Sequence, residues 1–301
     1  MTATGGLGQR SVTREAHAKL NVFLRVLSAR DDGYHELESL VLPLTLADTV
    51  IAQDALRLDV AVRGEPGLAR AADAGGGMNL GLVAALSLAE SCGVSRGAQV
   101  EIAKRIPVAA GLGGGSADAA AVLLALNDLW GCELDLEALL QVGERVGSDV
   151  PALLIGGPVL MRGRGERVEP VILQPTWWVV RPFDFPTRSP DAYRWWDEDG
   201  GVTGPDPAPV LDAAVRGDVE ALGAALANDL EAPVSARHPE IAATRDALLA
   251  AGALGALMSG SGPTVVALAR DHDHARELAE TQPGAIVASG PPGGPARADL
   301  G

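Results

Sequence analysis

Four glycines in one short run are the residues of this sequence that most directly indicate chemistry. They occupy positions 111, 113, 114 and 115, just after Pro107 and just before a segment rich in alanine and leucine. Glycine loses more backbone entropy on folding than any other residue and has no side chain to bury, so packing does not explain the run. A backbone that approaches a ligand closely, with its N–H groups directed at that ligand, does explain it. We therefore predict a binding loop here.

The residues after the glycines predict a helix over 117–130 with Ser116 as its N-cap. A glycine loop that leads into a helix N-terminus binds anions, most commonly phosphate, because free N–H groups and the positive end of the helix dipole meet there. The Walker A pattern is excluded because no lysine follows the glycines. The dinucleotide-binding pattern is excluded because Ser116 stands where that pattern needs its third glycine. A flexible hinge before an apolar helix is the alternative interpretation.

Lysine is the second residue type whose placement suggests chemistry. Lys19 and Lys104 are the two lysines among 24 basic residues, and the others are arginine. A compact ammonium can be steered where a planar guanidinium cannot, although neutral drift explains Lys104 equally well. Lys19 lies in an apolar alternation typical of a strand, and Asn21 shares its face. Such a pair indicates either a functional face or an ordinary solvated strand face.

The composition limits the classes of protein that need to be considered. The 301 residues allow one large or two medium domains, and the net charge of −15 argues against nucleic acid or an anionic membrane as partner. No apolar run reaches the roughly 18 residues of a spanning helix, and the N-terminus lacks the core of a signal peptide. Cys92 and Cys132 fit reduced thiols in a cytoplasmic chain, and no metal-ligand spacing is present. The oligomeric state stays open.

The expected elements mix strands and helices without strict alternation, which predicts an α+β fold. Residues 1–11 are expected to be disordered, residues 63–77 to form a loop, and residues 290–295 to form a loose tail. Strands are expected over 20–27, 37–44, 48–62 (one or two), 98–106, 168–180 (two), 254–258, 264–269 and 285–289, with extended structure over 152–162 and turns at 31–33 and 163–165. Helices are expected over 80–91 with Asn79 as N-cap and Gly93 as C-cap, and over 136–146, 210–230, 239–251 and 273–280, with a further helix start at 147–151.

The run from Pro107 to Ala121 resembles the phosphate-binding motif of the GHMP kinases (galactokinase, homoserine, mevalonate and phosphomevalonate kinases). Its Gly-Leu-Gly-Gly-Gly-Ser form is most similar to a branch whose substrate carries a cytidine diphosphate group. The resemblance covers roughly residues 15 to 290. It implies a two-domain fold, with a ribosomal-protein-S5-domain-2-like N-terminal domain over 1–160 and a ferredoxin-like α/β-plait domain over 161–301.

The resemblance also implies roles for particular residues. Lys19 takes the place of the family's catalytic lysine and Asp149 that of its base, whereas by itself Asp149 reads as a helix cap. ATP is the implied phosphoryl donor, and its triphosphate implies Mg²⁺, for which Ser116 and Asp118 are candidate contacts. Asn79 stands where the family holds adenine, without the acidic residue that usually accompanies it. The implied ATP-binding residues are Asn79, Lys104, Pro107, Val108, Ala109, Ala110, Gly111, Leu112, Gly113, Gly114, Gly115, Ser116 and Ala117.

The substrate side of the resemblance rests on three further stretches. Tyr34 is implied to stack on cytosine, with His35 reading the edge of the base. Tyr193 is the candidate second stacking face, or else a surface aromatic. The remaining implied substrate contacts are Asn21, Gly260 and Ser261, the last two in a stretch that also reads as a tight turn.

The activity implied by this branch is ATP-dependent phosphorylation of the 2-hydroxyl of 4-diphosphocytidyl-2-C-methyl-D-erythritol, in non-mevalonate isoprenoid precursor biosynthesis. The alternatives are a mevalonate-type or homoserine-type kinase of the same family, or a non-catalytic protein of this fold that binds a ligand. The Gly-Tyr-His stretch at 33–35 and the all-glycine loop favour the cytidyl branch over the former. The presence of both Lys19 and Asp149 argues against the latter.

Overall fold

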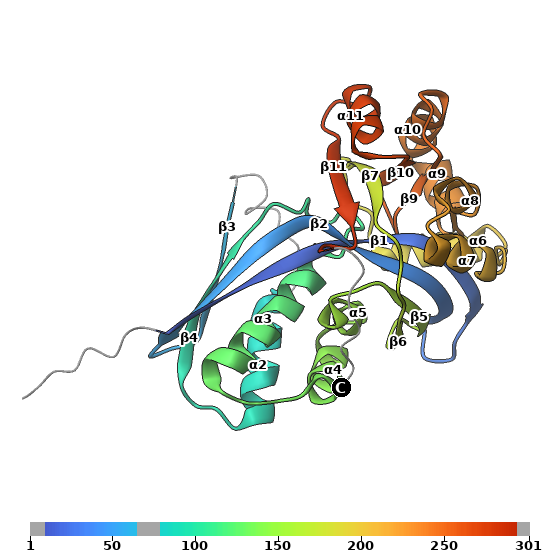
Figure 1. Cartoon of the computed structure of the whole chain (residues 1–301). Helices are drawn as coiled ribbons and strands as arrows, with labels where there is room; N and C mark the ends of the chain where they lie inside the picture. The colour runs from blue at the N-terminus through green and yellow to red at the C-terminus, as the bar shows by residue number, and fades with distance from the viewer. Residues whose placement is uncertain (1–9, 65–78, 294–301) are drawn as a thin grey trace, which may run out of the picture.

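The computed structural model describes residues 10–64 and 79–293. Within these residues the strands form one sheet of seven strands and one of four, which confirms the α+β class (Figure 1). The expected N-terminal lead, the loop over 63–77 and the C-terminal tail lie wholly or partly outside the described residues. No helix in the described part of the chain is long and apolar enough to cross a membrane.

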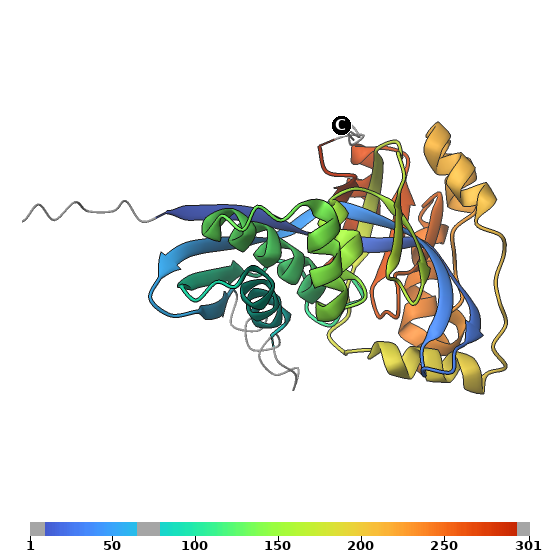
Figure 2. The ribbon, with the colours of Figure 1, turned by 90° about the horizontal axis from the view of Figure 1, so that it is seen from below.

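A long antiparallel hairpin forms the centre of the larger sheet. Its strands are β1 (Ser11–Ala29) and β2 (His35–Ala55), joined by the turn predicted at 31–33. β2 continues through residues 45–47, where two separate strands were expected, and the strand expected over 48–62 is the end of β2 followed by β3 (Asp59–Arg63). The hairpin runs the length of the molecule (Figure 2). The sheet has the order β3-β4-β2-β1-β8, and β5 pairs with β2 and β6; the bounds are β4 (Gly97–Ala103), β5 (Val159–Gly163), β6 (Arg167–Pro170) and β8 (Ala227–Asn228).

Helices cover one face of this sheet (Figure 1); they are α2 (Leu80–Cys92), α3 (Gly114–Trp130), α4 (Leu136–Val146) and α5 (Val150–Ile155). The predicted caps of α2 are confirmed, because the Asn79 side chain accepts a hydrogen bond from Gly81 N and Gly93 is left-handed. Cys92 and Cys132 are not joined by a disulfide in the described residues, and their reduced state stays a prediction.

Two predicted helix boundaries are wrong. α3 begins at Gly114, with Gly113 as a left-handed N-cap, so Ser116 lies in the first turn and does not cap the helix. The helix start predicted at 147–151 is confirmed by α5, but that helix continues over 152–155, where extended structure was expected, and the strand begins only at Val159. A run of six apolar residues has no period that separates strand from helix. Pro151 in the first turn and the left-handed Gly156 at the end favour the helix.

The second sheet is antiparallel throughout, in the order β11-β7-β10-β9, and lies on the other side of the hairpin from α2–α5 (Figure 1). Its strands are β7 (Thr176–Arg181), β9 (Gly255–Met258), β10 (Val265–Ala269) and β11 (Ile286–Gly290). The accompanying helices are α6 (Ser189–Glu198), α7 (Ala208–Arg216), α8 (Val219–Ala224), α9 (Glu231–Arg237), α10 (Pro239–Ala250) and α11 (His272–Glu280). The predicted domain boundary near residue 160 stays a prediction.

The helix expected over 210–230 is two helices, because the left-handed Gly217 ends α7 and Asp218 caps α8. α6 was not predicted, since it lies in a proline-rich stretch. Pro190 occupies its first turn, where the missing N–H of proline removes no helical hydrogen bond.

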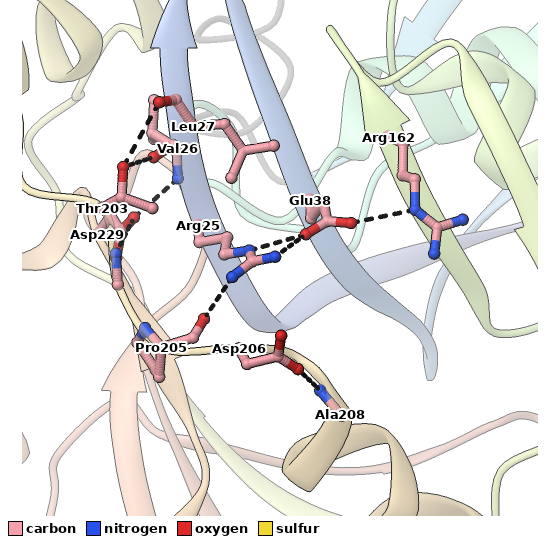
Figure 3. Close-up of polar contacts among 11 residues, drawn as sticks. Arg25, Val26, Leu27, Glu38, Arg162, Thr203, Pro205, Asp206, Ala208 and Asp229 are labelled. Carbon is pink, nitrogen blue, oxygen red and sulfur yellow. Dashed lines mark hydrogen bonds and ion pairs between the residues drawn. The ribbon is translucent and has the colours of Figure 1, made fainter.

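The segment that follows α6 is fastened to β1, which fixes α6 relative to the hairpin (Figure 3). Thr203 donates a hydrogen bond to the Val26 carbonyl (2.7 Å), and the Asp229 carboxylate accepts from Val26 N (2.8 Å) and Gly204 N (3.0 Å). Arg25 donates to the Pro205 carbonyl at 3.2 Å.

Arg25 also joins β1 to β2 through Glu38, and Glu38 continues the link to β5 (Figure 3). Glu38 accepts from Arg25 at 2.7 Å and from Arg162 at 3.1 Å. Burial opposes the ionisation of Glu38, but these two guanidinium groups hold the pKa of its carboxyl below the usual value.

We expect Asp229→Ala to lower the free energy of unfolding by about 1–3 kcal/mol, because the N–H groups of Val26 and Gly204 lose their acceptor. Urea denaturation measures this change. Asp212→Ala is the matched control, since the Asp212 side chain is 62% exposed and, within residues 10–64 and 79–293, its one ion pair is with Arg216 on the same helix. That control should shift stability by no more than about 0.5 kcal/mol. Equal losses in the two variants would contradict the structural role of Asp229.

Candidate active site

The glycine run forms a loop that lines a cavity of about 390 Å³. Ala109, Gly111 and Gly113 have left-handed backbones, with φ of 54°, 74° and 67°. Such a loop leaves N–H groups without regular partners, and the N-terminus of α3 adds its own. The predicted ATP-binding residues all line this cavity except Ala117, which is buried and donates its N–H to the Gly113 carbonyl within the helix.

A second glycine loop packs directly against the first. A Cβ on Gly111 would lie 2.6 Å from the Ser259 carbonyl oxygen and 2.7 Å from that of Gly262. The loop between β9 and β10 therefore lies beside the loop formed by the glycine run (the phosphate loop, residues 107–115), and only glycine at position 111 allows that approach. Gly113 is in similar contact with Lys19, whose Cγ would lie 2.8 Å from an added Cβ.

A buried set of charges lies under the loop. Lys104 Nζ is 2.5 Å from Asp48 Oδ2 and 2.7 Å from Asp118 Oδ2. The other oxygen of Asp48 accepts from the backbone N–H groups of Arg105 (2.5 Å) and Ile106 (2.8 Å). Lys104 thus lines the cavity as predicted, but its ammonium is already held by two carboxylates.

Asp118 is the partly satisfied member of this set. Its Oδ1 is buried and has no hydrogen-bond partner among the described residues. Burial raises the pKa of its carboxyl to about 7; Lys104 opposes the rise and the nearby Asp48 adds to it. Asp48, which joins Lys104 to the start of the loop, was not predicted from the sequence. Its only signal was a lone carboxylate in an apolar strand segment.

Lys19 and Asn21 share a face of β1, and that face is buried rather than solvated. Lys19 Nζ donates to Asn21 Oδ1 at 2.7 Å and lies 3.5 Å from Asp149 Oδ2. Asn21 is held in turn by Ser39, whose Oγ accepts from Asn21 Nδ2 at 2.7 Å. Asp149 occupies the N-cap position of α5 but makes no capping hydrogen bond, so its carboxylate is available. For Lys19 and Asn21 this geometry favours a functional face over a solvated strand face. For Asp149 it favours a functional carboxylate over a helix cap.

The second cavity, of about 470 Å³, brings together every predicted substrate residue: Asn21, Tyr34, His35, Tyr193, Gly260 and Ser261. Tyr193 is not an isolated surface aromatic, because its ring stacks on that of His35 with centroids 4.9 Å apart. His35 Nε2 lies 3.0 Å and 3.1 Å from the two carboxylate oxygens of Asp197. Only the remaining ring nitrogen of His35 is therefore left for a ligand. Asp197, on the unpredicted helix α6, was missed.

The two cavities meet at four residues that line both: Lys19, Asp149, Ser189 and Ser261. The hydroxyls of Ser189 and Ser261 are 2.9 Å apart and link α6 to the second glycine loop. An anion bound by the phosphate loop and a ligand in the larger cavity would therefore face each other across Lys19 and Asp149. A loop that can bind phosphates, next to a lysine ammonium and a carboxylate that caps no helix, is the arrangement that phosphoryl transfer requires.

Comparison with known proteins agrees with this geometry. Residues 79–157 match the family model of the GHMP kinases N terminal domain, and residues 210–281 match that of the GHMP kinases C terminal domain. The chain belongs to the GHMP kinase family.

The chain is similar over most of its length to individual members of this family. The 4-diphosphocytidyl-2-C-methyl-D-erythritol kinase of Symbiobacterium thermophilum is 45% identical over 269 residues, 88% of this chain and 93% of that protein. The enzyme of the same name from Streptomyces avermitilis is 41% identical over 285 residues, 93% of this chain and 94% of its own. Among solved structures, a 4-(cytidine 5'-diphospho)-2C-methyl-D-erythritol kinase is 36% identical with a TM-score of 0.77, over 93% of this chain and 99% of that one. A homoserine kinase from Cytophaga hutchinsonii shares the fold, with a TM-score of 0.69 at 20% identity over 96% of this chain and 97% of its own.

We expect Gly111→Ala to lower the free energy of unfolding by at least about 2 kcal/mol, since it combines a left-handed backbone with two backbone clashes. Gly115→Ala is the matched control in the same glycine run, because among the described residues its Cβ would meet only Leu80, at 3.6 Å. Position 115 is helical, so the control should keep or slightly raise stability. Urea denaturation of both variants checks the packing of the two loops, and an unchanged Gly111→Ala variant would contradict it.

Proposed function

We propose that this chain transfers the γ-phosphoryl group of ATP to the 2-hydroxyl of 4-diphosphocytidyl-2-C-methyl-D-erythritol, a step of non-mevalonate isoprenoid precursor biosynthesis. The observation that carries the proposal is the junction of the two cavities at Lys19 and Asp149. The likeness to relatives with that activity, over most of both chains, supports the choice of substrate.

In the proposed reaction, the phosphate loop binds the triphosphate through its backbone N–H groups and the N-terminus of α3. Asp149 accepts the proton of the attacking hydroxyl. The Lys19 ammonium, 3.5 Å from that carboxylate, stabilises the alkoxide as it develops. The oxygen then attacks the γ-phosphorus, the bond to the β-phosphate oxygen breaks, and the ADP produced stays on the loop.

Magnesium is part of the proposal because a triphosphate carries its charge more stably with a divalent cation. The residues present fit such an ion: Asp118 Oδ1 is buried and has no partner in the part of the chain that the structure describes, and Ser116 lines the same cavity. Carboxylate and hydroxyl oxygens are the ligands that Mg²⁺ accepts. Asp118 and Ser116 would hold the ion against the phosphates, where it would neutralise developing charge.

We expect Asp118→Asn to raise the Mg²⁺ concentration needed for half-maximal turnover roughly tenfold or more, because an amide is a far weaker ligand than a carboxylate. The asparagine oxygen can still accept from Lys104, so the fold should survive. Asp128→Asn is the control, since Asp128 lies on the same helix but pairs with Arg14 at the surface. Identical Mg²⁺ dependence in all three proteins would rule out Asp118 as a ligand.

For the second substrate, we propose that cytosine stacks on Tyr34, that Tyr193 supplies the second face and that His35 reads the edge. The contact between Tyr193 and His35 orders these groups on one wall of the larger cavity. Asn21, Gly260 and Ser261 lie next to Lys19 and would contact the sugar alcohol. Base stacking on an aromatic contributes roughly 1–3 kcal/mol.

The decisive experiment offers ATP with each of three acceptors: the cytidyl sugar alcohol, mevalonate and homoserine. We expect turnover only with the first. Asp149→Asn should lower kcat by at least ~10²-fold, because the proton acceptor is lost while size and polarity are kept. Its affinity for ATP should stay near that of the parent protein. Turnover of mevalonate or homoserine instead, or undiminished kcat in the variant, would refute the substrate and the base respectively. No turnover of any acceptor would favour a non-catalytic ligand-binding protein.

A further inference from the structure

The turn between β5 and β6 is built to hold one arginine at the larger cavity. Arg164 stands between Gly163 and Gly165, whose φ angles of 76° and 115° lie in the region that favours glycine. The Glu166 carboxylate accepts from Arg164 N at 2.7 Å and closes the turn. An added Cβ on Gly165 would lie 2.9 Å from Met161 Cε and 3.4 Å from the Ser148 carbonyl oxygen. The turn predicted at 163–165 is therefore confirmed, and it rests against the residue that precedes Asp149.

The Arg164 side chain lies over Tyr34. Its Cζ is 5.2 Å from the centroid of the tyrosine ring, and both residues line the larger cavity. A guanidinium that covers an aromatic face keeps its N–H groups in its own plane, where they remain free to bind an anion. Tyr34 is 52% exposed, so this pair stands at the mouth of the cavity rather than inside the core.

Arg164 differs from the other basic residues that line this cavity. Lys19 pairs with Asp149, and Arg194 pairs with Asp191 (3.1 Å) and Glu198 (3.5 Å). Arg164 forms no ion pair with any carboxylate in the described residues 10–64 and 79–293.

Asp32 is a carboxylate whose pKa is affected by Arg164, and it already forms an ion pair with Arg30. A hydrogen bond from Arg30 holds the pKa of the Asp32 carboxyl below its usual range, and the charge of Arg164 adds a smaller contribution. In a chain of net charge −15, an unpaired guanidinium held at a cavity is a site for an external anion.

We propose that Arg164 binds the diphosphate group of the cytidyl substrate while its guanidinium covers one face of Tyr34 and leaves the other to the base. The inference rests on the proposed function, because that function supplies a ligand with both a base and a diphosphate. A planar guanidinium matches two phosphate oxygens at once, which a single point charge does not. Arg164 thus links recognition of the base to recognition of the anion.

The test is equilibrium binding of cytidine, CMP and CDP, measured by calorimetry with the phosphate loop occupied by a non-hydrolysable ATP analogue. In the parent chain, affinity should rise from cytidine to CDP. In Arg164→Gln the ratio of CDP affinity to cytidine affinity should be roughly tenfold or more smaller than in the parent chain. The affinity for cytidine itself should change less than about threefold. Arg164→Lys should give an intermediate rise, since the charge stays but the planar fork is lost. Added salt should weaken CDP binding more in the parent than in Arg164→Gln.

Arg167→Gln is the matched control, because Arg167 is close in sequence and pairs with Glu36 outside the cavity. It should bind all three ligands like the parent chain. Equal weakening of cytidine and CDP in Arg164→Gln would mean that the arginine acts only by supporting Tyr34, which overturns the proposal. An unchanged rise from cytidine to CDP would overturn it as well.

Failure of the proposed function would give a different pattern. If the parent chain binds none of the cytidine ligands, inorganic pyrophosphate is titrated under the same conditions with the loop occupied. Pyrophosphate binding that is lost in Arg164→Gln and kept in Arg167→Gln would retain the anion site and reject the cytidyl substrate. Pyrophosphate binding that is the same in all three proteins, or absent from all, would overturn the role of Arg164.

Discussion

The hydrogen bonds and ion pairs of Asp48 and Lys104 are the interactions on which the phosphate loop depends. Asp48 has no exposed surface, yet it accepts from two backbone N–H groups just before the loop and from the Lys104 ammonium. Lys104 continues the link to Asp118 on α3, just after the loop. A loop with left-handed residues has few hydrogen bonds of its own, so its shape is set by these fixed ends. Removing one partner of such a buried pair costs about 3–5 kcal/mol, since a charge is left uncompensated.

The absence of side chains in the glycine loops is what brings distant parts of the chain to one point. Gly111 lets the loop contact the backbone at Ser259 and Gly262, and Asn21 N donates to Ser259 Oγ at 3.3 Å. Ser261 then reaches Ser189 at the start of α6, which carries Tyr193 and Asp197. The wall between the two cavities is therefore made from both sheets and from α6. Any displacement of that wall would alter both ligand sites together.

Features with a local cause could be predicted from the sequence. The glycine loop, the Asn79 and Gly93 caps and the shared face of Lys19 and Asn21 each follow from residues within a few positions of one another. Features with a distant cause could not. Asp48 and Lys104 are 56 positions apart in the sequence, and His35 and Asp197 are 162 positions apart. No sequence periodicity predicts either pair. The N-cap of α3 is Gly113 rather than the predicted Ser116, because tertiary contacts of the glycines, rather than side-chain capping, fix the first turn.

The two lysines of an otherwise arginine-rich chain are a further reason for the glycines of the loop. Lys19 and Lys104 are each only 7% exposed, and each is packed against a glycine of the loop. A Cβ on Gly113 would meet Lys19 Cγ at 2.8 Å, and one on Gly114 would lie 3.4 Å from Lys104 Nζ. A planar guanidinium is wider than an ammonium and is hard to seat in such a gap with its donors satisfied. The glycines therefore allow the close approach of the lysines beneath the loop, and in the proposed function they also allow the close approach of the ATP phosphates. The burial of the Lys104 ammonium between two carboxylates argues against drift in the choice of basic residue at this position.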